Sequence, residues 1–475
     1  MTSAWPQTPP TPEDRAAFAD ARPLSFWLDD LPGRDPHPAL AGSVEADLAI
    51  VGGGYTGLWA ALAAKTEDPA RSVVVLEADR CGQGASGRNG GFVQASLTHG
   101  LSNGVERFGD EIERLERLAT ENFLGLGDDL DRYAIDADFE TSGDVTFALE
   151  PHEIAWLEEE AELARRFGYD VELLDREQAR AQVNSPTFLA GLWTRTGSAL
   201  VHPGKLGAGL RAAAERAGVQ IFEFSPVHEL GPRGAAVALT TSGGELTARR
   251  ALVATSAYPG PLRTIRRYVA PVYDYALMSE PLSAEQRAAI GWRGRQGLSD
   301  VQNQFHYYRL SSDDRILWGG YDAVYRYGGP VDARLDVDDA TFAKLAQHFF
   351  TTFPQLRGLR FSHRWGGAID TCSRFSVFFG TEFDGRVAYA VGYTGLGVAA
   401  SRFGARVALD LLDGRETEAT RLNFVRRRPL PFPPEPLRSA VIQLTRNRLA
   451  AADRRQGRRG LWLGLLDRMG LGFDS

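Results

Sequence analysis

The sequence predicts an α/β protein with two interleaved domains and a helical extension at its C-terminal end. A short apolar strand from Asp47 runs into a glycine turn and then an Ala- and Leu-rich helix that ends near Lys65, and a second buried strand follows at 72–77. Continuous β-branched runs of this kind are typical of a parallel sheet that is covered on both faces. A strand, glycine turn and helix recur at 385–414. Between these parts, residues 270–325 consist of successive strand-like segments, which indicates a separate sheet region.

Length and composition limit the class of protein. A chain of 475 residues exceeds the roughly 250–300 residues that one core supports, so we expect two domains. The net charge of −8 argues against a nucleic-acid partner. Two cysteines, Cys81 and Cys372, cannot build a disulfide framework, and no Cys or His cluster suggests a metal site. Without a signal-peptide pattern or an apolar run of about 18 residues, we expect a soluble, cytoplasmic protein.

The elements between these landmarks follow from local patterns. We expect helices at 105–135, 151–182, 203–218 and 331–354, and strands at 141–149, 219–230 and 250–258. The helix at 203–218, for example, has Pro at its start and Gly at its end. Residues 1–45 are rich in Pro and polar residues, so we expect an extended arm that packs its apolar island, Phe26 and Trp27, onto the body.

A GxGxxG motif, Gly52, Gly54 and Gly57, joins the first strand to the first helix, and Glu77 ends the second strand. In this setting Gly52 permits a tight turn, Gly54 lets a pyrophosphate approach the backbone, and Gly57 lets the helix pack on the strand. The helix N-terminus supplies free N–H groups, and Glu77 can accept hydrogen bonds from a ribose hydroxyl. The motif predicts a Rossmann-like domain that binds NAD or FAD.

The glycine-rich segment 81–92 discriminates between these cofactors. A nicotinamide enzyme would normally enter its next strand and helix here. This segment instead holds five glycines, which let the backbone lie against the second phosphate and ring system of a longer cofactor. Arg88, or the N–H groups of its neighbours, can offset phosphate charge. The segment favours FAD, and a mobile surface loop is the alternative.

These motifs resemble the FAD-binding start of the D-amino-acid oxidase/glycine oxidase superfamily, and most closely that of its γ-glutamylputrescine oxidase-like amine oxidases. The likeness covers roughly residues 45–425. It includes 201–227, whose last residue packs on adenine in the family, the domain-closing strand at 248–262, and the last flavin motif at 387–405. The helix after that motif points its N-terminus at the pyrimidine end of the flavin in the family, where its dipole stabilises negative charge.

The motifs and the resemblance together assign the cofactor-binding residues. They are Gly52, Gly54, Tyr55, Thr56, Gly57, Glu77, Ala78, Ser86, Gly87, Arg88, Asn89, Gly90, Gly91, Val227, Ala254, Thr255, Gly392, Tyr393, Thr394, Gly395, Leu396 and Gly397. Relatives similar to sarcosine oxidase attach FAD through a Cys at the place of Gly366 or Gly367 here. Because Cys372 lies several residues away, we expect non-covalent FAD and a small buried apolar role for Cys372.

The resemblance implies a discontinuous FAD-binding domain. We expect its pieces at 46–104, 195–268 and 360–425, a substrate domain with a mixed or antiparallel sheet at 105–194 and 269–359, an N-terminal arm at 1–45 and a basic extension at 426–475. The extension has seven more basic than acidic residues, so the rest of the chain carries −15. We expect it to form a basic amphipathic helix that docks on the acidic body or on a second subunit, with an anionic membrane surface as the alternative.

The resemblance also implies oxidation of an amine or amino acid at its C–N bond. A neutral amine would give a hydride to flavin N5, the imine would hydrolyse, and O2 would reoxidise the flavin with release of H2O2. Two other interpretations stay open: a flavin dehydrogenase that passes electrons to a quinone or partner protein, and a non-catalytic FAD-binding subunit. Some relatives use a Lys above the flavin to promote the reaction with oxygen, and neither Lys205 nor Lys344 is suitably placed in the sequence.

Two further departures from the family border the expected substrate site. Leu396 stands where the γ-glutamylputrescine oxidases carry His, and 372–380 lacks the family's usual Pro, so we expect a different substrate. Strand residues that could form a cage for a cationic amine are Tyr273, Tyr275, His306, Tyr308 and Trp365. Each could equally be a sheet-core residue, His306 above all. Arg309 or Arg374 could pair with a substrate carboxylate.

Overall fold

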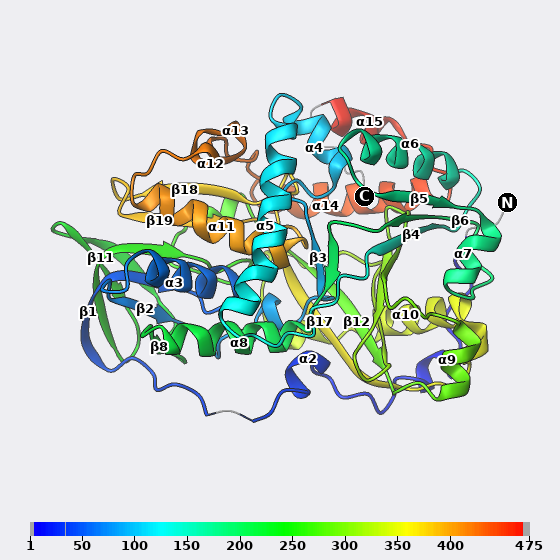
Figure 1. The fold of residues 1–475 in the computed structure, drawn as a ribbon, viewed down its shortest axis with the longest axis horizontal. Helices are drawn as coiled ribbons and strands as arrows, with labels where there is room; N and C mark the ends of the chain where they lie inside the picture. The colour runs from blue at the N-terminus through cyan, green and yellow to red at the C-terminus, as the bar shows by residue number, and fades with distance from the viewer. Residues whose placement is uncertain (1–3, 34, 469–475) are drawn as a thin grey trace.

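Two large β-sheets form the framework of the computed structural model, which describes residues 4–33 and 35–468 (Figure 1). Residues 1–3 and 34 of the predicted arm and 469–475 of the predicted extension lie outside the described residues. The first sheet has the strand order β18-β19-β11-β1-β2-β8, with the β9–β10 hairpin beside β11. Its strands are β1 (Gly42–Val51), β2 (Val73–Leu76), β8 (Gln220–Phe222), β9 (Glu229–Arg233), β10 (Ala236–Thr240), β11 (Gly244–Val253), β18 (Phe378–Glu382) and β19 (Val387–Val391).

The strands from β19 to β8 are parallel, and both faces of this part of the sheet are buried. Leu48 and Ile50 of β1 point to the face that is covered by α3 (Tyr55–Glu67), α8 (Pro203–Arg216) and α11 (Gly397–Leu412). Ala49 and Val51 point to the opposite face, into a second apolar cluster. The prediction of a covered parallel sheet is therefore confirmed. Both faces are buried because successive residues of these strands are apolar, and not only alternate ones.

The second sheet is mixed. Its strands β13 and β4 are parallel to each other, and all other neighbouring strands in this sheet are antiparallel. Its strands are β4 (Asp144–Ala148), β5 (Val171–Leu174), β6 (Ala190–Thr194), β12 (Ala270–Ser279), β13 (Gly297–Asp300), β14 (His306–Leu310), β15 (Ile316–Gly320), β16 (Val324–Tyr325) and β17 (Phe361–Thr371). The predicted domain boundary at residue 360 does not match this pairing, because β17 follows β12 along its whole length. Hydrogen bonding thus places 361–371 with the second sheet.

Helices and short strands complete the two layers. They are α1 (Pro12–Ala16), α2 (Phe26–Asp29), β3 (Phe92–Gln94), α4 (Leu101–Phe108), α5 (Ile112–Arg132), α6 (Glu153–Arg166), α7 (Arg176–Gln182), β7 (Ser198–Leu200), α9 (Ala284–Ile290), α10 (Asp339–Thr352), α12 (Glu418–Arg421), α13 (Asn423–Arg426), α14 (Leu437–Asp453) and α15 (Leu461–Arg468). The helix predicted at 151–182 is wrong in its middle, where β5 pairs with β6 between α6 and α7. Among the described residues, every helix is too short or too polar to span a membrane.

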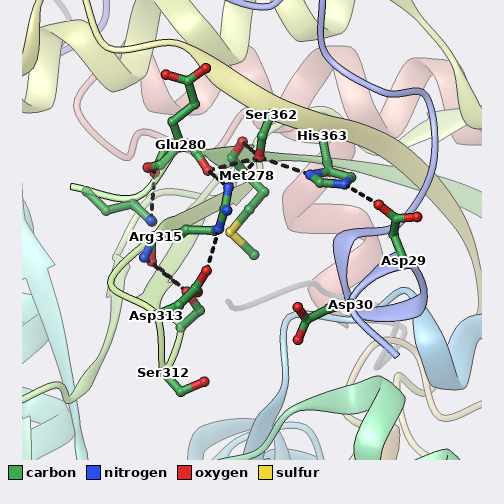
Figure 2. Close-up of polar contacts among 12 residues, drawn as sticks. Asp29, Asp30, Met278, Glu280, Ser312, Asp313, Arg315, Ser362 and His363 are labelled. Carbon is green, nitrogen blue, oxygen red and sulfur yellow. Dashed lines mark hydrogen bonds and ion pairs between the residues drawn. The ribbon is translucent and has the colours of Figure 1, made fainter. Parts of the chain in front are cut away.

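The N-terminal arm is pinned to the body by buried aromatic side chains and by a polar network (Figure 2). Phe26 and Trp27 are 4% and 1% exposed, which confirms their predicted packing. Next to them, Asp29 accepts a hydrogen bond from His363 Nε2 at 3.0 Å, and His363 Nδ1 lies 2.9 Å from Ser362 Oγ. The arm also reaches the glycine-rich segment, because Ser25 Oγ donates to the Gly87 carbonyl at 2.7 Å.

Ser362, His363 and Asp29 are the residue types of a hydrolytic triad, but the imidazole is reversed (Figure 2). Nδ1 faces Ser362 and Nε2 faces Asp29, whereas in a triad Nε2 faces the serine. Ser362 Oγ lies 3.0 Å from the Ser279 carbonyl, to which it donates, and it accepts from Arg315 at 3.0 Å. The network therefore fastens the arm to β17 and, through Ser362, to β12.

The C-terminal extension docks on its own chain, one of the two partners predicted for it, and most of its hydrogen-bonded anchors are not its arginines. Glu435 accepts hydrogen bonds from Tyr325 Oη at 2.8 Å and from the Gly328 N–H at 3.1 Å. Asp453, at the other end of α14, accepts from the Asn303 and Gln304 N–H groups, each at 3.2 Å. Two of the extension's few acidic residues are thus anchors. Of its arginines, Arg428 lies 4.0 Å from the Glu382 carboxylate and Arg438 donates to the Arg266 carbonyl at 3.4 Å.

Replacing Trp27 with Ala should destabilise the protein by about 3–5 kcal/mol, because a large side chain is removed from a filled site between Phe26 and His202. Thermal denaturation measures the effect. Tyr327, which is 70% exposed, provides the matched aromatic truncation, and Tyr327→Ala should leave the melting temperature nearly unchanged. Equal melting of the two variants would show that the arm is not part of the core.

Candidate functional site

The turn after β1 is built so closely that only glycine fits at two positions. Gly52 has φ +108°, and a Cβ on Gly57 would lie 1.9 Å from the Gly52 carbonyl oxygen. The helix α3 therefore starts directly on the end of the strand, with its first-turn N–H groups free of helical partners. One of these, the Tyr55 N–H, donates to Ser86 Oγ at 2.9 Å. The turn thus presents backbone N–H groups and a helix N-terminus to the space beside it, as a phosphate requires.

Glu77 lies at the end of the neighbouring strand and faces the same space. Its carboxylate accepts hydrogen bonds from the Gly53 N–H at 2.6 Å and from the Asp79 N–H at 2.9 Å. Burial raises the pKa of Glu77, and the two N–H donors oppose that rise. Each oxygen keeps a second lone pair, so the fixed carboxylate can still accept a hydrogen bond from a ribose hydroxyl.

The Arg–Asn pair of the glycine-rich segment has two structural tasks. Arg88 forms an ion pair with Asp336 and donates to the Gly366 carbonyl at 3.2 Å, which ties the segment to the second sheet. Asn89 donates to the Ser86 carbonyl at 2.9 Å and accepts from the Gly91 N–H at 2.8 Å, so it closes the segment on itself. Arg88 is therefore engaged by a carboxylate, whereas the sequence suggested a role against phosphate.

The second glycine turn joins β19 to α11 and is held by a carboxylate from the other sheet. Asp370, near the end of β17, accepts a hydrogen bond from the Gly392 N–H at 2.6 Å. Burial raises the pKa of Asp370 to about 6, against the effect of its backbone N–H donors. Because this bond joins the two sheets, it fixes the start of α11 relative to β17.

These parts surround one cavity of about 1250 Å³, larger than the roughly 300–1,000 Å³ of a typical small-molecule site. Most of the predicted cofactor-binding residues line it: Gly52, Gly54, Tyr55, Thr56, Glu77, Ala78, Ser86, Arg88, Asn89, Gly90, Val227, Ala254, Thr255, Tyr393, Thr394, Gly395, Leu396 and Gly397. Gly57, Gly87, Gly91 and Gly392 instead lie behind the lining, where each touches other parts of the protein. Such a cavity can hold a dinucleotide and a substrate together.

The predicted aromatic cage is only partly assembled. Tyr273, Tyr275 and Trp365 line the cavity. The two tyrosine hydroxyls, however, donate to the carbonyls of Asp332 at 3.3 Å and Leu335 at 2.8 Å, so they are already engaged. Trp365 is fixed by the hydrogen bond from its Nε1 to the Arg88 carbonyl at 2.9 Å.

His306 and Tyr308 lie on the other face of β14 and do not reach the cavity. His306 Nε2 is 2.9 Å from His348 Nδ1, and burial lowers the pKa of His306 to about 3, so its ring is neutral. Tyr308 packs on Trp318 at 4.6 Å between ring centroids. Successive strand residues alternate between faces, so the residue between these two, Tyr307, is the one that lines the cavity.

Tyr307 and Asp274 form the polar pair that the sequence analysis missed. The Tyr307 hydroxyl donates to Asp274 Oδ2 at 2.6 Å, and both residues line the cavity. Burial raises the pKa of Asp274 to about 6, although the Tyr307 hydroxyl opposes the rise. No basic side chain pairs with Asp274 among the described residues. The signal that could have found it is an acidic residue between two tyrosines in an otherwise apolar strand.

Several other predicted residues lie elsewhere. Arg309 donates to the carbonyls of Val201 and Leu310, and Arg374 to those of Phe424 and Arg427, so neither reaches a substrate. Lys205 and Lys344 pair with Asp138 and Asp322, each at 2.6 Å, and neither lines the large cavity.

Cys372 lines the cavity as a protonated thiol. It is 0% exposed, and its Sγ lies 3.2 Å from the Ser376 carbonyl and 3.4 Å from the Gly392 carbonyl. Burial raises its pKa, against the effect of nearby Arg374. Within 4–33 and 35–468, no group of three or more His, Cys, Asp or Glu could hold a metal ion.

The residues present fit FAD. Two glycine turns, each opening a helix, would hold a pyrophosphate and the flavin, and Glu77 and Val227, which line the same cavity, would contact the adenosine. The glycine-rich segment between them has its own polar groups satisfied by Asn89 and leaves backbone exposed to the cavity.

Comparison with known proteins gives the same assignment of fold. The family model described as DAO, FAD dependent oxidoreductase, matches residues 47–411. Gamma-glutamylputrescine oxidoreductase of Escherichia coli (strain K12) is 32% identical over 406 residues, which cover 84% of this chain and 90% of that protein. A probable oxidoreductase OrdL of Rhizobium meliloti (strain 1021) is 29% identical over 445 residues, 90% of this chain and 97% of the relative.

Solved structures share the fold at lower identity. Glycine oxidase from Geobacillus kaustophilus superposes with a TM-score of 0.63 at 20% identity and covers 81% of this chain and 99% of its own. L-proline dehydrogenase from P. horikoshii has a TM-score of 0.64 at 16% identity, with 81% and 96% covered. These likenesses show the arrangement of the two sheets.

Replacing Gly57 with Ala should yield protein with at least about tenfold less bound flavin, because the new methyl group would collide with the Gly52 carbonyl and overpacking costs about 1–3 kcal/mol or more. The flavin-to-protein absorbance ratio after purification measures this. Gly464→Ala is the matched control, since nothing lies within 4 Å of a Cβ there, and it should keep its flavin. Full flavin content in Gly57→Ala would rule out this turn as the phosphate site.

Proposed function

We propose that this chain, which belongs to the FAD dependent oxidoreductase (DAO) family, oxidises an amine or amino acid at a C–N bond. The observation that carries the proposal is the Asp274–Tyr307 pair beside Trp365. A buried carboxylate that has no basic partner among residues 4–33 and 35–468, on a cavity that fits FAD, suits a substrate that brings a positive charge. The relative named for gamma-glutamylputrescine supports an amine substrate.

The chain's own residues would prepare the substrate. FAD bound along the two glycine turns would take up a hydride from the carbon next to the substrate nitrogen, leaving an imine that water hydrolyses. Asp274 would hold the ammonium group and accept one of its protons, because the neutral amine is the form that releases hydride. Tyr307 orients the carboxylate through its hydrogen bond at 2.6 Å, and the fixed Trp365 ring gives the site a rigid wall. We propose non-covalent FAD, since the Cys372 thiol is engaged by backbone carbonyls.

Molecular oxygen is the electron acceptor that we propose, with H2O2 as its product. One observation favours a dehydrogenase that passes electrons to a quinone or partner protein: neither Lys205 nor Lys344 lines the cavity, and both are paired with carboxylates. The cytoplasmic location stays a prediction, and two buried cysteines that form no disulfide within the described residues fit a reducing compartment.

A panel of primary, secondary and methylated amines and amino acids, added without air to the purified holoenzyme, should bleach the flavin absorbance with one substrate class. Admission of air should then restore the colour rapidly and release H2O2. Slow recovery in air would identify a dehydrogenase instead. A flavin that dithionite reduces but no amine or amino acid reduces would contradict the proposal and indicate a non-catalytic FAD-binding subunit.

Replacing Asp274 with Asn should lower kcat/KM by about 10²–10⁴, the usual contribution of a positioned base. In the unmodified enzyme, kcat/KM should rise as pH increases through about 6, the pKa of the Asp274 carboxyl, and this limb should vanish in Asp274→Asn. Steady-state kinetics between pH 5 and 8, a range that spans the pKa of Asp274, measure both the fall in kcat/KM and the loss of its pH dependence.

Thermal melting provides the second readout of the same variant. Because the folded-state pKa of Asp274 is raised, its ionised form costs the folded protein stability above pH about 6, and this cost disappears as pH falls. Asp274→Asn should therefore melt no lower than the unmodified protein at alkaline pH. Asp384→Asn, at a side chain that is 93% exposed, controls for the loss of a charge. An undiminished kcat/KM in Asp274→Asn would exclude Asp274 as the base that accepts the substrate proton.

A further inference from the structure

The C-terminal extension forms part of the cavity wall, although it lies beyond the residues that the family model matches. From α14, one helical face lines the cavity: Val441, Ile442, Thr445, Arg446 and Leu449. These positions follow the spacing of three and four residues that puts side chains on one side of a helix. From α15, Leu466 lines the same cavity. The extension is therefore a cap on the substrate side.

The cap is held firmly enough to position a side chain. Phe432 and Ile442 pack against Ala270, Val272 and Tyr325 of the second sheet. The carboxylates of Glu435 and Asp453 fasten both ends of α14 to loops of that sheet, as described above. Trp462 Nε1 of α15 donates to Thr445 Oγ1 at 3.1 Å, which joins α15 to α14. Thr445 is the residue directly before Arg446.

Arg446 differs from the other arginines that line the cavity among the described residues. Of the arginines that line the cavity among the described residues, Arg88 pairs with Asp336, and Arg266 is exposed on the turn at 265–267. Arg446 is half-buried and makes no ion pair or hydrogen bond within the described part of the chain. Arginine is the side chain best suited to hold a carboxylate by two parallel hydrogen bonds. The arginines that the sequence suggested for this task, Arg309 and Arg374, point elsewhere.

We propose that Arg446 binds a carboxylate of the substrate, so that the enzyme prefers amines that also carry a carboxylate. The inference rests on the proposed amine oxidation, because it takes Asp274 as the site of the ammonium group. Asp274 on β12 and Arg446 on α14 lie on the same cavity, and α14 packs on β12 through Val272, two residues before Asp274. A zwitterionic substrate would thus be held at both charges, one by the sheet and one by the cap.

The test compares Arg446→Gln with Arg448→Gln. Arg448 lies on the same helix, is exposed and does not line the cavity, so its replacement removes the same charge from the solvent side. The substrates are straight-chain amino acids with the amine at one end and the carboxylate at the other, separated by an increasing number of carbons. Each is compared with the alkylamine of the same length that lacks the carboxylate. Arg446→Gln should raise KM for the amino acids by about 10–100-fold, the loss expected for a charge-assisted hydrogen-bonded pair. KM for the alkylamines and kcat should stay nearly constant, and Arg448→Gln should behave as the unmodified enzyme.

Binding without turnover provides a second readout. Butyrate, titrated into the oxidised holoenzyme, should perturb the flavin absorption spectrum and compete with substrate, and Arg446→Gln should weaken this binding by a similar factor. An equal loss for amino acids and alkylamines, or no loss in Arg446→Gln, would overturn the anion site. An unmodified enzyme that oxidises both series equally well would overturn it while the proposed function stands. If no amine reduces the flavin but butyrate binding depends on Arg446, the proposed function fails and the anion site remains.

Discussion

The cofactor half of this protein depends on a contact between two glycines. Gly57 in α3 approaches the Gly52 carbonyl so closely that a Cβ would lie 1.9 Å from its oxygen. The helix can therefore begin on the very end of β1, where its free N–H groups face the cavity. Glu77 and Ser86 then arrange the next strand and the glycine-rich segment around that turn, through the Gly53 and Tyr55 N–H groups.

The two sheets are coupled at the cavity by buried charged groups. Arg88 reaches from the cofactor side to Asp336, and Asp370 reaches from the second sheet to the Gly392 N–H. Burying such groups is costly unless their hydrogen bonds are complete, and here each has a partner on a separate segment: Asp336, on the turn at 333–336, for Arg88, and Gly392, directly after β19, for Asp370. The same bonds that offset the cost of burial also set the spacing between the flavin turns and the strands that face the substrate.

Asp274 and the C-terminal cap show how chemistry is divided over the fold. Asp274 is a carboxylate kept in a poorly solvated place, which lowers the stability of the folded chain at neutral pH and raises the basicity of the group. The cap, by contrast, lies outside the part matched by the family model and is fixed to the second sheet by hydrogen bonds of Glu435 and Asp453. A segment attached in this way can change the substrate side of the cavity without disturbing the cofactor turns.

The cofactor turns could be predicted from the chain because their physics is local: the glycines, the strand and the helix are neighbours in sequence, and most of the predicted residues line the cavity. The substrate side could not. Whether Tyr307 or its neighbours His306 and Tyr308 face the cavity depends on the register of β14, since one residue's shift exchanges the two faces of a strand. The pairing of Asp274 with Tyr307 and the packing of Ile442 of α14 on β12 join residues far apart in the chain. Such encounters are decided by the packing of whole elements, which no local pattern records.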